Sequence, residues 1–432
     1  MQKVQCLMAS DNIPRSPRIV ALARALANHQ PHALADFWSQ VTAQGTPLVE
    51  PDPHDSASAL VTFLWRGTAT TRNVVVVGGV ADQDVAEDFI HHQMAQLPGT
   101  DLWYRTYRTS SAAHFVYRLS PNDALIMPAD VTNWREREAT FQPDPLNQHP
   151  YQVDEDEPAS IARLPGVIAQ PWLGPPAVPV GSIETHTWHG TDVNAERTVW
   201  IYPPPSTSRH ATPSHLLLLL DGPSYVQPPF VPMILDHLLA AGRVPPTLCV
   251  NVGFANDGGS SREHELACNP AFADALANEL VPWLRERYQC HAAADATIIG
   301  GASLSGLAAA YTALRHPQVF GNVLSQYGYF SWAPPQPDEP CEYTWLAQRY
   351  LDSPTLPIRF SLTVGLFDSV AFLNHKQRPS LLLANRHFRD ILRAKGYHVT
   401  YREVYSGHDE LNKRYSFADA LLALLDYGSE VR

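Results

Sequence analysis

The chain has 432 residues, of which 45% are hydrophobic and 17% are charged. A chain of this length and apolar content can bury large cores, so we expect two or three folded domains and no extensive disorder. Its formal net charge of −12 argues against a nucleic-acid or anionic-membrane partner, because both require a basic surface.

Cysteine and histidine usage gives no sign of a metal or disulfide framework. The 5 cysteines are scattered without a C-x-x-C pair, and the 19 histidines are dispersed without an H-E-x-x-H motif. The N-terminus lacks the apolar core of a signal peptide, and no apolar run reaches the ~18 residues of a membrane span. We therefore expect a cytoplasmic protein that carries no cofactor.

The N-terminal half has the pattern of a mainly β module. Residues 17–44 show helical apolar spacing, and short strand-like runs separated by turn residues follow. These runs are 60–64, 74–77, 102–106 and 115–119. Residues 142–182 are rich in Pro, Asp and Gln and have little periodicity, which predicts a linker or crossing segment.

From residue 198 onward, predicted strands alternate with predicted helices. The strands are 198–202, 215–220, 247–252, 296–300, 322–325, 359–364 and 399–404. The helices are 231–241, 270–288, 304–315, 380–395 and 415–427. This alternation is typical of βαβ units, so we predict an α/β domain with a mostly parallel sheet.

One segment of the second half has the pattern of a nucleophile elbow. Residues 296–310 are ATIIGGASLSGLAAA, in which a β-branched run meets small residues around Ser303 and a strong helix former follows. The usual pattern in α/β-hydrolases is G-x-S-x-G, since a nucleophile on a strained turn needs small neighbours. Here Ser305 occupies the fifth position and Gly306 follows it. The alternative is an ordinary connection between a strand and a helix.

Two further residues complete the order serine, acid, histidine that this fold requires. Asp368 follows the predicted strand 359–364, and His408 follows the strand 399–404. His408 would take the proton of Ser303 and return one to the leaving alcohol, while Asp368 would hold the imidazole tautomer. We prefer Asp368 to Asp409, because a direct sequence neighbour is poorly placed to orient the ring. A helix-capping role for Asp368 is the alternative.

An oxyanion hole needs two N–H donors. The backbone N–H after the nucleophile, that of Leu304, is one of them. The second normally comes from the loop after an early strand, here the loop after 215–220. Pro223 has no N–H, which leaves Gly222, with Ser224 as its alternative.

Several segments resemble the enterochelin (enterobactin) esterases and extend over nearly the whole chain. They are 61–66, 97–104, 262–266, 269–272, 301–326, 385–397 and 407–409. Relatives usually have glycine where this chain has Ser305, and many carry glutamate where it has Asp368. The resemblance implies a substrate-covering N-terminal domain over residues 1–165 and an α/β-hydrolase catalytic domain over residues 166–432.

The same resemblance implies an intracellular serine esterase for ferric catecholate siderophores such as ferric enterobactin. Such an enzyme cleaves the ester bonds of a tri-serine lactone and so releases the iron, which enters only as part of the substrate. We expect no nucleic-acid or membrane partner, and a monomer or small homo-oligomer. The alternatives are a carboxylesterase for another acyl or aryl ester and a ferric siderophore binding protein without catalysis.

The charge of this substrate points to candidate binding residues. A tris-catecholate ferric complex carries about three negative charges and flat aromatic faces, so an acidic protein must gather cations and aromatic rings around it. We take Arg262, Arg386, Trp332 and Arg105 as candidates. Further candidates are Lys376, Arg378, Arg108, Tyr329 and Phe330. The alternative for each arginine is a solvated or structural ion-pair role.

Overall fold

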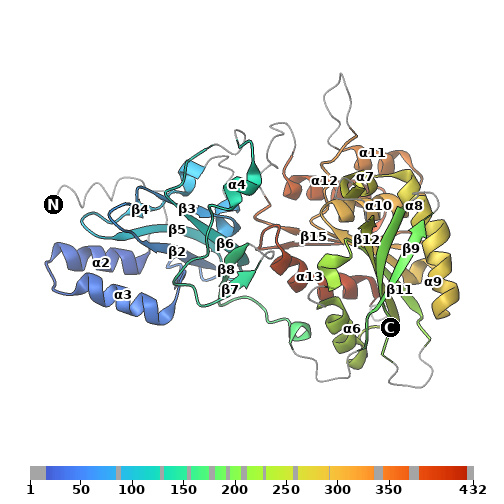
Figure 1. Cartoon of the computed structure of the whole chain (residues 1–432), viewed down its shortest axis with the longest axis horizontal. Coiled ribbons are helices and arrows are strands. Elements are labelled where there is room, and N and C mark those ends of the chain that lie inside the picture. Colours follow the sequence, from blue (N-terminus) through green and yellow to red (C-terminus); the bar gives the residue numbers. More distant parts are fainter. Residues whose placement is uncertain are drawn as a thin grey trace. The chain divides into compact units, whose positions relative to one another are not determined.

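The computed structural model describes residues 16–83, 89–126, 131–152, 157–174, 181–190, 195–205, 212–226, 230–255, 261–290, 292–334, 344–368 and 379–425. They pack as two compact units, which Figure 1 shows in the colours of the sequence. The first unit contains the chain up to Ile168 together with Leu366–Lys376 and Tyr405–Asn412, and the second contains the rest. The predicted domains, residues 1–165 and 166–432, are continuous segments, whereas each of these units combines separate segments of the chain. The predicted domain boundary stays a prediction.

The first unit is built on two antiparallel sheets of 4 strands each. One has the order β1 (Leu48–Pro51), β2 (Ser58–Arg66), β5 (Leu102–Ser110), β4 (Ala95–Gln96). The other has the order β3 (Val74–Val77), β6 (His114–Pro121), β8 (Pro158–Arg163), β7 (Pro150–Gln152). One core joins residues of both sheets, among them Phe63, Phe115 and Tyr117. The predicted mainly β character is confirmed.

Strands β7 and β8 lie within residues 142–182, so the prediction of a linker there is wrong for this part. Strand β8 pairs with β6 on one side and β7 on the other. Its buried residues are the small Ala159, Ser160 and Ala162, which give little hydrophobic signal in the sequence.

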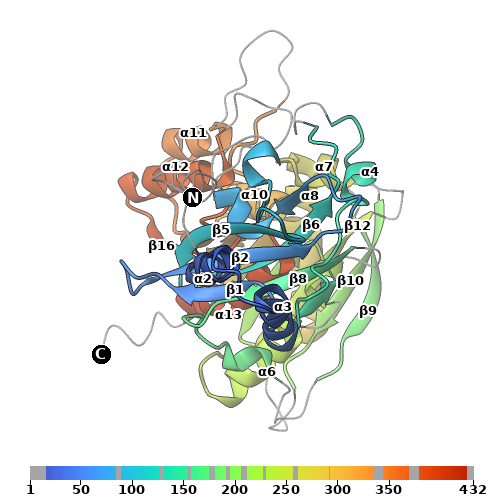
Figure 2. The ribbon, with the colours of Figure 1, turned by 90° about the vertical axis from the view of Figure 1, so that its left-hand side faces the viewer.

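The helical stretch predicted over 17–44 is two helices, α2 (Pro17–Ala27) and α3 (Ala33–Gln44). Between them His29 and His32 adopt left-handed φ values of 51° and 67°, which ends one helix before the other begins. Figure 2 shows both helices beside β1 and β2. Their apolar residues, such as Leu22 and Trp38, share a core with those strands.

The second unit is organised around a sheet of 8 strands. Its order is β16 (His398–Val404), β15 (Arg359–Gly365), β14 (Asn322–Gln326), β13 (Thr297–Ala302), β11 (His215–Leu220), β12 (Thr247–Ala255), β10 (Ala195–Tyr202), β9 (Glu184–Gly190). Strands β11 to β16 run parallel to one another, whereas β10 pairs antiparallel with β12, and β9 pairs antiparallel with β10. This is the predicted mostly parallel sheet of an α/β-hydrolase.

Helices cover both faces of this sheet (Figure 1). They are α5 (Pro223–Val226), α6 (Phe230–Ala240), α7 (Ser261–Leu266), α8 (Pro270–Ala275), α9 (Val281–Tyr288), α10 (Leu304–Arg315), α11 (Trp345–Asp352), α12 (Leu381–Ala394) and α13 (Glu410–Leu425). One core gathers residues of α8, α9, α10 and α12, and the other gathers residues of α6 and α13. A π-turn over Leu276–Leu280 joins α8 to α9, so the long helix predicted over 270–288 exists in a distorted form.

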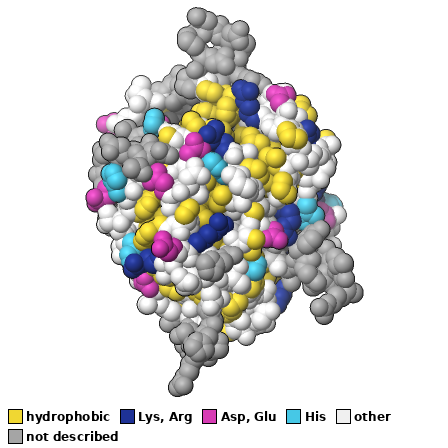
Figure 3. All heavy atoms as spheres, turned by 90° about the vertical axis from the view of Figure 1, so that its right-hand side faces the viewer, with side chains coloured by type: hydrophobic (Ala, Val, Ile, Leu, Met, Phe, Trp, Pro, Cys, Tyr) yellow, Lys and Arg dark blue, Asp and Glu magenta, His cyan; other side chains and the backbone are white. Residues whose placement is uncertain are grey.

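Helix length and surface charge of the described residues bear on possible membrane and nucleic-acid partners. None of their helices combines the length and the apolarity that crossing a bilayer requires. On the face of the molecule drawn in Figure 3, basic and acidic side chains are interspersed with apolar ones. A continuous basic patch is therefore absent from the described part of that face.

Candidate active site

Ser303 lies on a sharp turn between β13 and α10, at φ 57° and ψ −119°. A non-glycine residue at positive φ is strained, and it persists only where its surroundings hold it. The N–H of Ser303 donates to the carbonyl of Gln326 at 2.9 Å, and the carbonyl of Ser303 accepts from the N–H of Tyr329 at 2.9 Å. The Ser303 side chain is not used as a helix cap. This is the geometry of a nucleophile elbow.

The glycines around Ser303 are required because neighbouring atoms of the chain lie very close to them. A Cβ on Gly301 would lie 2.4 Å from Cβ of Ser305, and a Cβ on Gly306 would lie 2.4 Å from Oγ of Ser325. Both distances are far below van der Waals contact, so neither position tolerates a larger residue without movement. The elbow therefore keeps two of its glycines for steric reasons.

The N–H groups of the two predicted oxyanion donors are placed differently in the structure. Leu304 is the first residue of α10, so its N–H has no intrahelical acceptor. In contrast, the N–H of Gly222 donates to the carbonyl of Val252 at 2.9 Å, and that of Ser224 donates to the carbonyl of Asp221 at 3.1 Å. Both N–H groups thus have acceptors within the described chain, because the loop after β11 turns at once into α5 and closes onto β12. The assignment of Gly222 as the second donor stays a prediction.

His408 and Asp368 lie together in the first unit. The Nδ1 atom of His408 is 3.8 Å from Oδ1 of Asp368, whose side chain is only 4% exposed. Phe367 packs in the core of this unit at 5.6 Å from the ring of Phe115, and its N–H donates to the carbonyl of Ser406. The loop of Asp368 is thus held by the core packing of Phe367. Its backbone hydrogen bond to Ser406 ties it to the loop of His408, which sets the contact between acid and histidine.

Asp409 has a different use. Its Oδ1 atom accepts the N–H of Asn412 at 2.7 Å, which caps the first turn of α13. Burial, the largest cause, raises the pKa of Asp409 to about 7. This placement supports Asp368 as the partner of His408.

The three predicted catalytic residues follow the carboxyl ends of three strands of one parallel sheet. Ser303 follows β13 in the second unit, whereas Asp368 follows β15, His408 follows β16, and both belong to the first unit. Carboxyl ends of parallel strands are where this fold class places its sites. The elbow and the His–Asp contact are each present, and their joint action as a triad is a proposal.

We expect Asp368→Asn to lower kcat for ester hydrolysis by roughly 10- to 100-fold. A tightly bonded triad acid is worth about 10⁴-fold, but the 3.8 Å separation is longer than a hydrogen bond, so we expect a smaller effect. Asp409→Asn serves as the control, because its carboxylate caps α13. A greater loss of kcat in Asp409→Asn than in Asp368→Asn would reverse the assignment.

Arg262 and Arg386, two of the predicted binding residues, both form ion pairs. Arg262 donates from Nε and Nη2 to the carboxylate of Asp221 at 3.0 and 2.6 Å, and its guanidinium lies 5.5 Å from the centre of the Phe254 ring. Arg386 donates to both carboxylate oxygens of Glu403 at 2.7 and 2.8 Å, which raises the pKa of Arg386. Arg386 is thus in the structural ion pair that was its alternative.

The remaining candidates divide into three groups. Arg105 lies over the ring of Tyr107 at 5.4 Å, and no partner for its buried Nε lies in the described part of the chain. Arg108 pairs with Asp52 and Asp55. Lys376 and Arg378 lie outside the described residues.

The aromatic candidates differ in burial. Trp332 is half-buried and meets Trp345 edge to face at 5.6 Å, while Tyr329 is also half-buried. Phe330 is 2% exposed and stacks on Phe388 at 4.1 Å, so it belongs to the core, which argues against contact with substrate. Trp332 and Tyr329 therefore remain candidates for a flat aromatic ligand.

Asp221 is a site residue that the sequence analysis missed. It has a left-handed φ of 74°, and its carboxylate accepts from Arg262 and from the hydroxyl of Ser305. The available signal in the sequence was an acidic residue at a strand end, directly before Gly222 and Pro223. This signal did not reveal its hydrogen-bond partners, Arg262 and Ser305.

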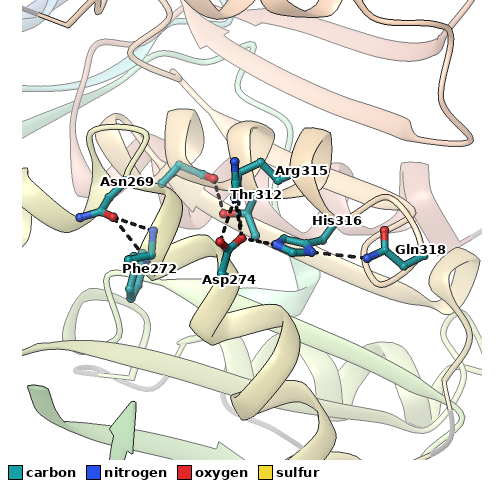
Figure 4. Close-up of polar contacts among 9 residues, drawn as sticks. Asn269, Phe272, Asp274, Thr312, Arg315, His316 and Gln318 are labelled. Carbon is teal, nitrogen blue, oxygen red and sulfur yellow. Dashed lines mark hydrogen bonds and ion pairs between the residues drawn. The ribbon is translucent and has the colours of Figure 1, made fainter. Parts of the chain in front are cut away.

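A second His–Asp contact lies at the far end of α10 (Figure 4). The carboxylate of Asp274 accepts from Nε2 of His316 at 2.6 Å and from Arg315 at 2.8 Å. His316 occupies the C-cap position of the helix whose N-cap position is Ser303. Since 12 residues of helix span about 18 Å, this pair cannot serve the elbow. It links α8 to α10.

Asp82 gives a stability prediction in the first unit. Burial and then the charge of Asp409 raise the pKa of Asp82 from 3.8 to about 7. The folded protein therefore holds this proton more tightly than the unfolded chain, and the resulting stabilisation is lost as pH rises from about 4 through 7. We expect the unfolding free energy of Asp82→Asn to exceed that of the wild type by about 1 kcal/mol at pH 8, where Asp82 is charged. The gain stays this small because Asp82 is partly exposed and solvent screens its charge. At pH 5, where folded Asp82 is mostly protonated, the gain should be smaller still.

Urea unfolding at the two pH values measures this difference. Asp55→Asn is the control, since hydrogen bonds from Ser58 and the backbone lower the pKa of Asp55 and predict the opposite sign. An equal gain at pH 5 and pH 8 would contradict the assignment to the Asp82 charge.

Metal chemistry has no support in the described part of the chain. No group of three or more His, Cys, Asp or Glu side chains there could hold a metal ion. The prediction that the protein carries no cofactor of its own stays a prediction.

The chain is similar to known esterases over most of its length. Residues 60–173 match the family model "Enterochelin esterase, N-terminal", and residues 190–424 match the model "Putative esterase". The iron(III) enterobactin esterase of Dickeya dadantii is 28% identical over 422 residues, which cover 90% of this chain and 92% of that protein.

Solved structures show the same fold. The ferric enterobactin esterase of Salmonella typhimurium has a TM-score of 0.71 at 24% identity, covering 92% of this chain and 100% of that one. The enterobactin esterase of Shigella flexneri, solved in the presence of enterobactin, has a TM-score of 0.68 at 26% identity, covering 89% and 97%. With both family models matched, the chain belongs to the enterochelin esterase family.

Proposed function

We propose that this protein is a serine esterase that hydrolyses the ester bonds of a ferric catecholate siderophore such as ferric enterobactin. The observation that carries the proposal is Ser303, held at φ 57° between β13 and α10 in a chain of this family. The relative from Dickeya dadantii is named as an iron(III) enterobactin esterase, and a neighbouring structure was solved with enterobactin.

The chemistry follows from the three residues. The hydroxyl of Ser303 attacks the ester carbonyl while His408 takes its proton, and the leaving serine alcohol of the lactone receives that proton as the C–O bond breaks. The N–H of Leu304 stabilises the oxyanion. Water then attacks the acyl-enzyme with His408 again as base, which releases the acid and restores Ser303. Asp368 keeps the imidazole in the required tautomer.

Recognition of the ferric complex would use fixed cations and aromatic faces. Arg262, held by Asp221 and Phe254, and Arg105, over Tyr107, are the cations that we propose for the anionic catecholates. Trp332 and Tyr329 are the aromatic candidates. The iron enters with the substrate, and the protein supplies no metal ligand in this proposal.

We also propose that the reaction takes place in the cytoplasm, where reductants can take iron from the cut chelator. The cysteines that the structure describes, Cys249, Cys268 and Cys290, are free and buried, which fits a reducing compartment.

A comparison of substrates tests the function. We expect kcat/KM for ferric enterobactin to exceed that for p-nitrophenyl butyrate and methyl ferulate, each measured with the purified full chain. Iron-free enterobactin in parallel gives the contribution of the metal to recognition. Turnover of the simple esters without any cleavage of enterobactin would favour the other carboxylesterase, and binding of ferric enterobactin without turnover of any ester would favour a binding protein.

A further inference from the structure

Ser305 occupies the position that is usually glycine in the elbow motif, and its side chain has a defined use. It is fully buried, and its hydroxyl donates to Oδ2 of Asp221 at 2.5 Å. Side chains at the start of a helix point back toward its N-terminus, which here faces the end of β11. The sheet register agrees, since Leu219 pairs with Gly300 and the next residues lead to Asp221 and the elbow.

The carboxylate of Asp221 joins three elements at the sheet edge. It accepts from Ser305 on α10 and from Nε and Nη2 of Arg262 on α7, which follows β12. The carbonyl of Asp221 accepts both the N–H and the hydroxyl of Ser224. These bonds hold Asp221 at its strained φ of 74°.

Arg262 is correspondingly fixed. Two of its nitrogen atoms are bound by Asp221, and its guanidinium lies against the ring of Phe254 at 5.5 Å. Its side chain is still 36% exposed. Within the described residues, its hydrogen bonds use Nε and Nη2 and leave Nη1 available. An arginine held in this way presents its remaining N–H groups to an anion without losing rotamer entropy on binding.

We infer that Ser305 is a positioning residue that fixes Asp221 and, through it, the guanidinium of Arg262 for an anionic substrate. This inference rests on the proposed function and names the residue that ties the anion-binding arginine to the nucleophile elbow. In place of a flexible glycine at the fifth position of the motif, this chain has a hydroxyl that removes freedom from the binding group.

Affinity for ferric enterobactin in the Ser303→Ala background tests this, because binding is then measured without turnover. The Kd is measured by quenching of the intrinsic fluorescence. We expect Ser305→Ala to raise this Kd about 10-fold and Arg262→Met to raise it at least as much. Adding Ser305→Ala to Arg262→Met should change the Kd by less than twofold, since Ser305 acts through Arg262. Thr312→Val is the matched control: it removes a buried hydroxyl that bonds Ala308 within the same helix, and its Kd should stay within twofold of the parent.

A merely structural role gives a different pattern. An unchanged Kd in Ser305→Ala would overturn the inference. So would a double variant whose increase in Kd equals the product of the increases in the two single variants. Failure of the Ser303→Ala parent to bind ferric enterobactin would overturn it as well. If Ser305→Ala unfolds, Ser305→Gly, which restores the usual motif, gives the same comparison. Lack of turnover by the wild type with the binding pattern intact would contradict the proposed hydrolysis and leave the role of Ser305 supported.

Discussion

Replacing Ser303 with alanine is expected to lower kcat for ester hydrolysis by on the order of 10⁴- to 10⁶-fold. The substitution removes only the hydroxyl group, and the elbow keeps its backbone hydrogen bonds to Gln326 and Tyr329. A serine-directed phosphonate should label the wild type at Ser303 and leave Ser303→Ala unlabelled. Stopped-flow or long-time product measurements on the same ester give the ratio of rates.

The control for this prediction is the neighbouring hydroxyl of Ser305, which bonds Asp221. Ser305→Ala should still react with the phosphonate at Ser303. Full hydrolysis by Ser303→Ala, or labelling at a residue other than Ser303, would remove this serine as the nucleophile.

Replacing Glu265 with alanine is expected to destabilise the second unit by about 3–5 kcal/mol. Arg197 on β10 is completely buried between the rings of Trp188 and Phe272, and it donates from two nitrogen atoms to Glu265 on α7 at 2.8 and 2.9 Å. Without Glu265 the guanidinium keeps its charge in an apolar environment with no carboxylate to neutralise it. Thermal unfolding should show a midpoint lower by about 10 °C.

Two variants separate the buried pair from ordinary ion pairs. Asp419→Ala breaks an exposed pair with Arg402 and should cost less than about 1 kcal/mol. The double variant Arg197→Met/Glu265→Leu, which removes both charges, should recover most of the stability lost in Glu265→Ala. A midpoint for Glu265→Ala within 2 °C of the wild type would contradict this account.

The order of strands and helices in the second unit could be predicted because its elements are long and regular in pattern. Helix 304–315 was predicted at its observed bounds, and the predicted strands overlap observed ones. The prediction was less successful in the first unit, where the Pro-rich segment 142–182 contains β7, which has no buried residue, and β8, whose buried residues are small. Pattern reasoning detects large apolar residues, so β7 and β8 could not be found in this way.

The nucleophile and the contact between His408 and Asp368 could be proposed from residue type and order alone. The hydrogen bonds around the site could not. Gly222 has its N–H directed to Val252, Arg386 pairs with Glu403, and Asp221 joins Arg262 to Ser305. Each depends on which residues of neighbouring strands come into register, and this is a property of the folded sheet and not of the local sequence.

The most direct measurement is the product analysis of purified protein incubated with ferric enterobactin, with Ser303→Ala in parallel. The account predicts stepwise release of 2,3-dihydroxybenzoyl-serine units by the wild type and none by the variant, as followed by chromatography. Intact ferric enterobactin in the presence of a wild-type protein whose Ser303 still reacts with a phosphonate would contradict the siderophore as substrate.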